Sequence, residues 1–571
     1  MGPALDRGSV GARLKGEDMR NQKVSRRSFL MGAGMGTVAM AGAGLLGCAP
    51  ASSGATAAQA PTTETAPDWR QAPEPIAADD IAETVSTDVV IVGAGLAGCC
   101  AAMSAAEAGL KTIVLQKLDR VFNYATGIAS YNCRAQIEAG APDKYDVDEL
   151  LSLYMSQATN LPDRRFIELW KERSGKDADW LYDLMADTDL DAPSWSWDEP
   201  EPIMGMFDCI AAMPLLAEKA QAKGVEFRFS TPAVQLEREG DGTGRVTAVI
   251  AQGDDGSYLK FEASKAVILC AGDYGNNPAM RAEFMPHAEG FSSAVTPAVN
   301  TGDGDLMALW VGAAMDKKPH CTNIHYDLID FNTSQVFGSG IPWLRVNREG
   351  QRFSNEDVVY GLIPLQDASQ PDCMHIDVFD ANYEQYKPLM GTGLYRSDPP
   401  VEAFAPTYRA YLDEKGIDHA GLSDYAAIIK AHLELGTMCE GATIEELAGK
   451  VGVDAATLKA TVDRYNTLVE QGKDEDFGKP AEYLFPIEKA PFYAVPRHAF
   501  SLSCLSGLAI NLNAQVLDEA GEVIPGLFAC GNNSGGAWFA GLVQPMCIPG
   551  VPSSRAIITA RVAVETIVAG K

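Results

Sequence analysis

The stretch TDVVIVGAGLAGCC holds three glycines, Gly93, Gly95 and Gly98, in the spacing G-x-G-x-x-G. Glycines placed in this way allow a tight turn and let a pyrophosphate approach the backbone N–H groups around Ala94. The helix that follows would point its partly positive N-terminus at the phosphates. These residue types and their spacing predict a dinucleotide-binding turn.

The segments on both sides of this turn are the elements that such a site needs. Residues 89–92 form an apolar run that predicts a strand, an alanine-rich stretch after the turn predicts a helix, and residues 112–115 predict a second strand. The glycine motif alone is weak evidence, whereas the same motif between two strands is strong. Gln116 stands where an acidic residue would normally bind the ribose, and its amide can still hydrogen-bond a hydroxyl.

Three later segments carry further motifs: KAVILCAGDYGNNPAM at 265–280, NTGDGDLMALWVGAAM at 300–315 and IPGLFACGNNSGG at 524–536. Their order resembles the successive FAD-contacting motifs of the flavoprotein superfamily of fumarate reductases, urocanate reductases and 3-ketosteroid dehydrogenases. The resemblance also covers residues 344–357 and 443–480, and so spans nearly all of the chain after residue 85. It implies FAD as the cofactor and an α/β fold, in which an α+β capping domain is inserted into a Rossmann-type FAD-binding domain.

The resemblance also implies which residues contact FAD. Besides the glycine turn, these are Gln116, Asn123, Val234, Ala271, Gly272, Asp303, Gly531 and Asn532. Near the C-terminus, Pro552 and Ser553 begin a predicted helix, since proline suits the first helical turn. By resemblance, the N-terminus of this helix faces the flavin N1/O2 edge, where it would stabilise reduced anionic flavin. An ordinary C-terminal helix would begin in the same way.

The segment 443–480 is predicted to be helical. Thr443 and Glu446 form a capping-box pattern. Apolar residues then recur at helical spacing as Leu458, Val462, Tyr465 and Val469. In the family this region belongs to a mobile cap. We therefore expect an FAD-binding domain at residues 80–318 and 499–571 and a cap at 319–498, with the active site where the two meet.

The substrate region departs from that of fumarate reductases, which grip two carboxylates with charged side chains. The Glu and Arg of their proton relay align with Val336 and Ser339, and the residues that grip the carboxylates fall near Leu502, Ser503 and Cys547. Because these residues cannot supply charge-assisted hydrogen bonds to a dianion, fumarate is expected to be a poor substrate. Four aromatic residues are predicted to bind a flat apolar substrate instead: Phe337, Trp343, Trp538 and Phe539. Each of them alone is more often part of a core.

Three residues are candidates for acid–base catalysis. Tyr360 falls where the family's proton-donating arginine stands, and a phenol is protonated at neutral pH. His325 lies within one residue of a substrate-site histidine in relatives, and His498 lies at the return from the cap to the FAD-binding domain. The alternative for each is a structural hydrogen bond.

These residues predict a reductase that passes hydride from flavin N5 to the activated C=C bond of an apolar or aromatic enoate or enone. The chain has no C-x-x-C-H haem-attachment motif, so the electrons would come from a separate donor, such as a cytochrome c or a membrane quinol-linked protein. Two alternatives remain. One is a 3-ketosteroid-type dehydrogenase that forms the C=C bond, and the other is a non-catalytic lipoprotein that binds flavin or an apolar ligand.

Residues 1–48 resemble a twin-arginine export signal, because Arg26 and Arg27 precede a soft apolar run that ends at Cys48. A membrane-spanning helix is the alternative, but the many glycines lower its helix propensity. The signal predicts a protein exported to the periplasm or to the outer face of the cytoplasmic membrane, and leaves a lipid anchor at Cys48 open. Residues 49–79, rich in Ala, Thr and Pro, are expected to form a disordered linker.

Composition restricts the partners further. A formal net charge of −30 argues against nucleic acid, whose phosphates would be repelled. It could attract a basic electron carrier, although solubility alone would explain it. The twelve cysteines include no C-x-x-C and the seven histidines show no metal-binding spacing, so no metal site is predicted.

Overall fold

The structure is a computed structural model. It describes residues 68–125, 127–138, 140, 146–190, 194–195, 204–293, 298–327, 341–358, 360–386, 425–536, 538–545, 547–548 and 550–570. The predicted export signal, the linker up to residue 67 and Phe337 lie outside these ranges. Within them, no helix combines the length and apolar character needed to cross a membrane.

The largest sheet is the core of the nucleotide-binding half. Its order is β16-β17-β9-β1-β2-β6, and β8 pairs with β9 and with β7. The strands are β1 (Ile81–Val92), β2 (Thr112–Leu115), β6 (Glu226–Arg228), β7 (Ala233–Arg238), β8 (Val246–Gln252), β9 (Tyr258–Leu269), β16 (Gln515–Leu517) and β17 (Val523–Ala529). β6, β2, β1, β9 and β17 run parallel, so their carboxyl ends lie at one edge of the sheet.

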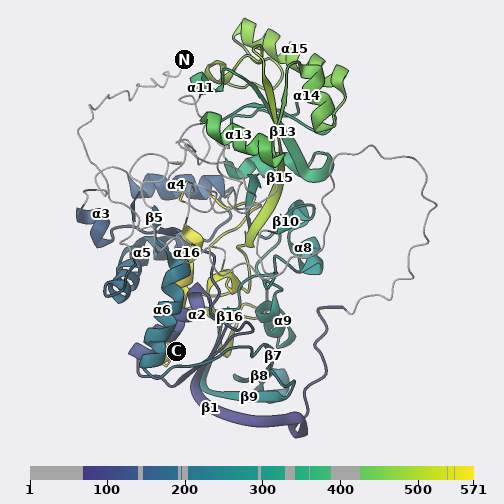
Figure 1. Cartoon of the computed structure of the whole chain (residues 1–571). Coiled ribbons are helices and arrows are strands. Elements are labelled where there is room, and N and C mark those ends of the chain that lie inside the picture. The colour runs from purple at the N-terminus through teal and green to yellow at the C-terminus, as the bar shows by residue number, and fades with distance from the viewer. Residues whose placement is uncertain are drawn as a thin grey trace, which may run out of the picture.

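Helices cover the face of this sheet on which α2 (Leu96–Glu107), the helix after the glycine turn, lies. α2 packs between α16 (Val551–Val568) and α6 (Cys209–Ala222), and α5 (Arg164–Met185) packs on α16 (Figure 1). Small residues let α2 lie close to its neighbours, and all of it from Leu96 to Ala105 is buried. The parallel sheet with its crossover helices confirms the predicted α/β fold.

A second sheet, at the upper end of the molecule in Figure 1, is mostly antiparallel. Its order is β10-β15-β13-β12, and β11 and β14 also pair with β15. The strands are β10 (Ser292–Ser293), β11 (Thr322–Asp327), β12 (Leu344–Val346), β13 (Met374–Asp380), β14 (Cys439–Gly441) and β15 (Phe492–Cys504). α14 (Ile444–Val451) and α15 (Ala455–Gln471) pack against it around a separate apolar core that includes Leu447 and Leu458.

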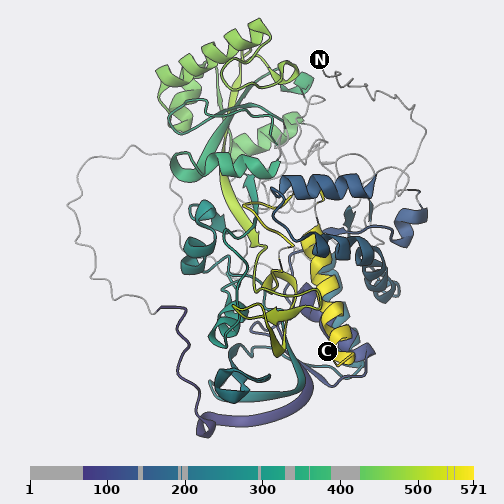
Figure 2. The same ribbon diagram turned by 180° about the vertical axis from the view of Figure 1, so that it is seen from behind.

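β15 connects the two ends of the molecule. Its first half pairs with β13 and β14, and its second half pairs with β10 and β11. Figure 2 shows it running from the upper helices toward the large sheet. The expected return to the FAD-binding domain at residue 499 falls inside this strand, and the division into two domains stays a prediction.

The helical prediction for 443–480 is confirmed in part. Two helices form rather than one, because Gly452 ends α14 in a left-handed conformation (φ 76°) and Asp454 caps α15 through the N–H of Thr457. Gly472 ends α15 in the same way, so residues 473–480 are not part of a helix.

Shorter elements complete the described chain. They are η1 (Ala78–Asp80), β3 (Gly127–Ala129), α3 (Arg134–Glu138), α4 (Val147–Gln157), β4 (Ser194–Trp195), β5 (Met204–Met206), α7 (Glu239–Gly242), α8 (Pro278–Phe284), η3 (Pro286–Ala288), α9 (Asp303–Trp310), η4 (Tyr360–Leu362), α10 (Ile363–Asp367), η5 (Pro371–Cys373), α11 (Tyr383–Tyr386), α13 (Tyr425–Leu435), η6 (Ala481–Tyr483) and η7 (Gly531–Asn533).

Candidate active site

The glycine turn lies between β1 and α2, as the sequence predicts. A Cβ on Gly93 would lie 2.3 Å from the carbonyl oxygen of Cys270, and one on Gly98 would lie 2.0 Å from the carbonyl oxygen of Gly93. Gly93 also has a φ of +103°, which disfavours any side chain. Gly95, the N-cap residue of α2, has no side chain to cap the first turn, which leaves backbone N–H groups for a phosphate.

Two predicted contacts follow β2. Gln116 is buried at the end of the strand, and its Nε2 donates to the carbonyl of Arg120 at 3.1 Å. Asn123 donates through Nδ2 to the carbonyl of Ala125 at 3.2 Å. The N–H of Phe122 donates to the carbonyl of Ala94 at 3.3 Å, which ties this loop to the glycine turn. Gln116 and Asn123 are therefore brought to the same edge as the glycines.

Val234 lies in β7 and is half-buried. It comes three residues after Thr231, whose N–H donates to the carbonyl of Gln116 at 2.9 Å. The backbone before β7 thus reaches the loop that follows β2.

The ends of β9 and β17 bring four more predicted contacts together. The N–H of Ala271 donates to Asn533 Oδ1 at 2.6 Å, which joins the two loops. Gly272 and Gly531 both have left-handed φ values, +85° and +61°. A Cβ on Gly531 would lie 2.9 Å from that of Ala97 on α2, so the strand approaches the helix closely. Asn532 belongs to a polar cluster described below.

Asp303 begins α9 and pairs with Lys117 at 2.8 Å between Nζ and Oδ2. Thr301 donates to its other oxygen at 2.8 Å. Lys117 was not among the predicted site residues, and its place directly after Gln116 was the available signal. The pair joins the loop after β2 to the loop before α9.

Pro552 and Ser553 lie in the first turn of α16, as predicted. Gly550 precedes the helix with a φ of +81° and offers no side-chain cap. The N–H of Ala129 donates to its carbonyl at 3.2 Å, which fixes the helix start against β3. The first N–H groups of α16 therefore have no side-chain partner from the residue that precedes the helix.

Four polar residues meet among these loops, and of these only Asn532 was predicted from the sequence. Tyr124, Asn300 and Asn532 all contact one carboxylate oxygen, Oδ2 of Asp273, which lies directly after Gly272. We call Asp273, Tyr124, Asn300 and Asn532 the Asp273 cluster. Each member stands in or beside a motif segment, but only the fold shows that they touch.

These loops fit FAD. They follow the carboxyl ends of parallel strands, where nucleotides bind in this class of sheet, and they combine glycine close approaches with two uncapped helix N-termini. When bound, FAD supplies two-electron hydride chemistry that no amino-acid side chain provides. Within the described residues, no group of three or more His, Cys, Asp or Glu is arranged to hold a metal.

The backbones of the three candidate acid–base residues lie close together. His325 in β11 faces Phe500 of β15, two positions from His498, which faces Asp327. Tyr360 begins η4, which packs against β11. The side chains of His325 and Tyr360 lie outside the described part of the structure. Burial is the largest effect on His498 and lowers its pKa, with a further contribution from Arg348, so this imidazole is neutral at physiological pH.

The structure does not bring the predicted aromatic residues into one group. Trp538 and Phe539 have exposed fractions of 0% and 1% and lie in the core beside Phe166 and Tyr154. Trp343, 2% exposed, stacks on Phe379 with ring centroids 4.7 Å apart. Trp343 borders a pocket of only about 10 Å³, and Trp538 and Phe539 are packed in the core, so contact with a substrate stays a prediction for all three.

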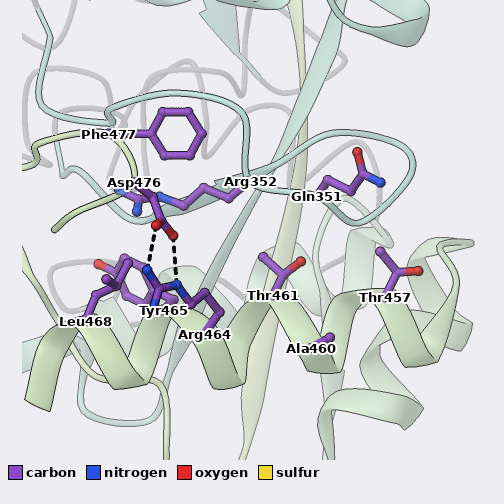
Figure 3. A pocket seen from close by; sticks show the side chains of 10 residues that line it. All are labelled: Gln351, Arg352, Thr457, Ala460, Thr461, Arg464, Tyr465, Leu468, Asp476 and Phe477. Carbon is purple, nitrogen blue, oxygen red and sulfur yellow. Dashed lines mark hydrogen bonds and ion pairs between the residues drawn. The ribbon is translucent and has the colours of Figure 1, made fainter.

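A groove of about 390 Å³ lies elsewhere, along α15 at the upper end of the molecule. Figure 3 shows Arg464 and Asp476 paired across it, at 2.7 Å. Arg352, which also lines this groove, is paired with Glu356 and Asp474. The cations of this groove are neutralised, and the groove is separate from the loops that fit FAD.

Comparison with known proteins supports this assignment. A vinyl phenol reductase of Lactiplantibacillus plantarum is 28% identical over 80% of this chain and 91% of its own length. A digoxin reductase of Eggerthella lenta is 26% identical over 91% of this chain and 93% of its own. A flavocytochrome c3 fumarate reductase structure matches in fold with a TM-score of 0.62, at 24% identity over 86% of this chain and 79% of its own.

A family model described as FAD binding domain matches residues 88–543. That range contains the glycine turn, the Asp273 cluster and the upper sheet. The predicted resemblance is confirmed, and the reductases among the relatives fit the oxidoreductase expected from the motifs. The chain belongs to this FAD binding domain family, and its cofactor is FAD.

Proposed function

We propose that the protein reduces the activated C=C bond of an apolar or aromatic enoate or enone, using FAD as the hydride carrier. The observation that carries this proposal is the lack of a charged side chain at two described positions, near which the resemblance to fumarate reductases implies residues that grip a dicarboxylate. Ser503 is buried in β15, and Cys547 is buried with its N–H donating to Gln157 Oε1 at 3.1 Å. The names of the relatives, a vinyl phenol reductase and a digoxin reductase, agree with an apolar substrate.

The chain's own residues would then place the substrate and deliver a proton. Tyr360 is proposed as the acid that protonates the carbon beside the reduced position, since a phenol holds its proton at neutral pH. His498 on the neighbouring β15 is neutral, so this imidazole supplies no positive charge to attract a dicarboxylate. Whether the protein reduces or forms the C=C bond would depend on the electron donor or acceptor with which it reacts.

An anaerobic assay with reduced viologen tests the function. Cinnamate-like acids, phenolic styrenes, steroid enones and unsaturated lactones are offered as acceptors, with fumarate as the matched charged control. We expect turnover with at least one apolar acceptor and little with fumarate. Oxidation of the saturated product by an added electron acceptor, with no reduction of any alkene, would instead identify a dehydrogenase. No turnover in either direction would leave a binding protein.

The role of Tyr360 is tested by Tyr360→Phe, which removes only the hydroxyl. Loss of a positioned acid slows a reaction by about 100-fold or more, so flavin reoxidation by substrate should slow by that factor while reduction by dithionite does not change. Single-turnover rates separate this effect from slowed closure of the cap. A variant that turns over at the normal rate would exclude Tyr360 and make His325 the next candidate.

We further propose export by the twin-arginine route and an external electron donor. Residues 25–48 support the first, and the absence of a haem-attachment motif supports the second. Replacing Arg26 and Arg27 with lysine should trap the flavoprotein in the cytoplasm, because the paired arginines are the signal. Unchanged secretion of the double variant would show that this segment has been misread.

A further inference from the structure

One buried carboxylate stands at the centre of the loops that fit FAD. Asp273 has no exposed surface, and its Oδ2 accepts hydrogen bonds from Asn532 Nδ2 and Asn300 Nδ2, both at 3.1 Å, and from the Tyr124 hydroxyl at 3.4 Å. Its Oδ1 accepts from the N–H of Gly275 at 2.8 Å. Both oxygens are therefore acceptors, and among the residues that the structure describes no cation is paired with either of them.

A buried arginine fixes the direction of these bonds. Arg555 on α16 has an exposed fraction of 0% and donates to Asn532 Oδ1 at 2.7 Å. A guanidinium can only donate, so the amide of Asn532 must turn its oxygen to Arg555 and its nitrogen to Asp273. The hydrogen bonds from Arg555 to Asn532 and from Asn532 to Asp273 therefore run in one direction, and Asp273 Oδ2 must be the acceptor. Ionised Asp273 is the form that accepts at both oxygens.

Arg555 is itself held in place. It also donates to the carbonyls of Leu505, at 2.6 Å, and Ser534, at 3.1 Å. Burial lowers its pKa to about 10, which keeps it charged at neutral pH. The cationic end of the chain is therefore permanent, whereas the carboxylate end can change its charge.

The loops after β2, β9 and β17, the loop before α9 and the first turns of α16 each supply one member of this network. Tyr124 follows Asn123 in the loop after β2, Asp273 follows Gly272 after β9, and Asn300 lies three residues before Asp303. Asn532 is itself a predicted FAD contact, and Arg555 lies two residues after Ser553. The glycine turn joins through the hydrogen bond of Phe122 to Ala94. Segments that are distant in sequence thus share one hydrogen-bond acceptor.

We propose that Asp273 is the positioning residue of the FAD site, and that its ionised carboxylate holds the loops after β2, β9 and β17 and the loop before α9 in the arrangement that binds FAD. The buried carboxylates Glu356 and Asp474 are each paired with Arg352, whereas the bonds to Asp273 Oδ2 come from neutral donors in three of the loops that fit FAD. Burial raises the pKa of Asp273 to about 6, although its hydrogen bonds act to lower it. Ionising this carboxylate at neutral pH therefore lowers the stability of the folded state.

The test measures FAD affinity of flavin-stripped protein by fluorescence titration, together with the flavin spectrum and midpoint potential of the reloaded protein. Asp273→Asn removes the charge at constant size, and loss of charge-assisted hydrogen bonds is expected to weaken FAD binding by about tenfold or more. Asn532→Asp places a second carboxylate at 3.1 Å from the first. Like charges so close cannot both ionise, and FAD binding should weaken by about 100-fold.

The double variant Asp273→Asn with Asn532→Asp exchanges the two side chains and keeps one carboxylate and one amide. The Tyr124 hydroxyl and the Asn300 amide can turn over to suit the exchange. We expect FAD affinity to recover to within about tenfold of the wild type, since the single carboxylate then pairs with Arg555. A role in stability alone would instead leave the FAD affinity of all three folded variants at the wild-type value.

Asp380→Asn is the matched control. Asp380 is equally buried and accepts the N–H groups of Asn382, Glu488 and Lys489 in the upper half of the molecule. Its substitution should lower thermal stability and leave FAD affinity and midpoint potential unchanged. The proposal is overturned if Asp273→Asn binds FAD within twofold of the wild type with the same spectrum and potential, or if the double variant is no better than the weaker single variant.

Discussion

Buried charge is balanced differently in the upper half of the molecule and at the FAD loops. In the upper half, Arg352 pairs with Glu356 and Asp474 at 2.8 Å each, and Lys479 lies 3.3 Å from Glu356. At the FAD loops, the carboxylate of Asp273 is held by neutral donors alone. The first network has cations and anions in direct contact, whereas the second keeps an anion and a cation apart, with an amide between them.

The pKa values reflect this difference. Burial by itself would raise the pKa of Glu356, but Lys479 and Arg352 outweigh it and lower the value below its usual range. At Asp273 burial prevails and the pKa rises to about 6. The charge of Glu356 therefore stabilises the folded state, whereas the charge of Asp273 is disfavoured by its burial. A buried group with a strongly shifted pKa is a candidate for a functional role.

The largest effect is expected at the glycine turn. Gly98→Ala puts a methyl group 2.0 Å from the Gly93 carbonyl oxygen, so the turn must move and FAD content should fall to less than about a tenth of the wild type. Gly449→Ala is the control, because a Cβ there meets nothing within 4 Å. Flavin absorbance per protein measures the effect. Full flavin content in Gly98→Ala would show that this turn does not hold the cofactor.

Arg352→Met tests the other half of the comparison. It leaves Glu356 and Asp474 without their shared partner, and breaking a buried pair costs about 3–5 kcal/mol. The flavin content of the folded variant should not change. Arg464→Met, on the exposed pair of the same groove, is the control and should alter stability little (Figure 3). Urea unfolding measures both, and equal losses in the two variants would contradict the assignment.

The pH dependence of stability should separate the two networks next. Because the folded state holds a proton on Asp273 up to about pH 6, against 3.8 ordinarily, its contribution falls as the pH rises through this window. The two-unit shift corresponds to about 3 kcal/mol, so flavin-free Asp273→Asn should gain about that much relative to the wild type between pH 4 and pH 7. Asp305, Cys504 and Tyr124 lie nearby, and the charge of Asp273 contributes to the raised pKa of each, so the measured difference includes their response to the substitution. Parallel stability profiles would refute the raised pKa.

The smallest expected effect is local to the upper half. Thr443 caps α14 by accepting the N–H of Glu446 at 3.1 Å, and Thr443→Ala should cost about 1 kcal/mol without altering flavin content. Thr467→Ala is the control, since that hydroxyl bonds only within its own exposed helix turn. Thermal unfolding of the two variants gives the comparison, and a larger loss for Thr467→Ala would contradict the capping assignment.

Sequence patterns predicted the parts of the fold that depend on neighbouring residues. The glycine turn, the start of α16 at Pro552 and the capping box at Thr443 all appear where their motifs stand. The break between α14 and α15 could also have been predicted, because Gly452 and Asp454 are a common helix stop and start. Local chemistry determines each of these features.

The Asp273 cluster could not be predicted in the same way. Asn532 is 259 positions from Asp273 and 408 from Tyr124, and their contacts exist only because β9, β17 and the loop after β2 end at one edge. The positions of the aromatic residues also depend on the fold. Trp538 and Trp343 are both predicted to contact the substrate, and core packing places their rings in separate clusters, beside Phe166 and Phe379.

The most direct test of the whole account is stopped-flow reoxidation of the dithionite-reduced protein under anaerobic conditions. The account predicts about one FAD per chain, as the single nucleotide-binding unit requires, and rapid reoxidation by an apolar enoate or enone. Fumarate at the same concentration should reoxidise it slowly. A protein that binds no FAD after reconstitution, or one whose reduced flavin is reoxidised faster by fumarate than by any apolar alkene, would contradict the account.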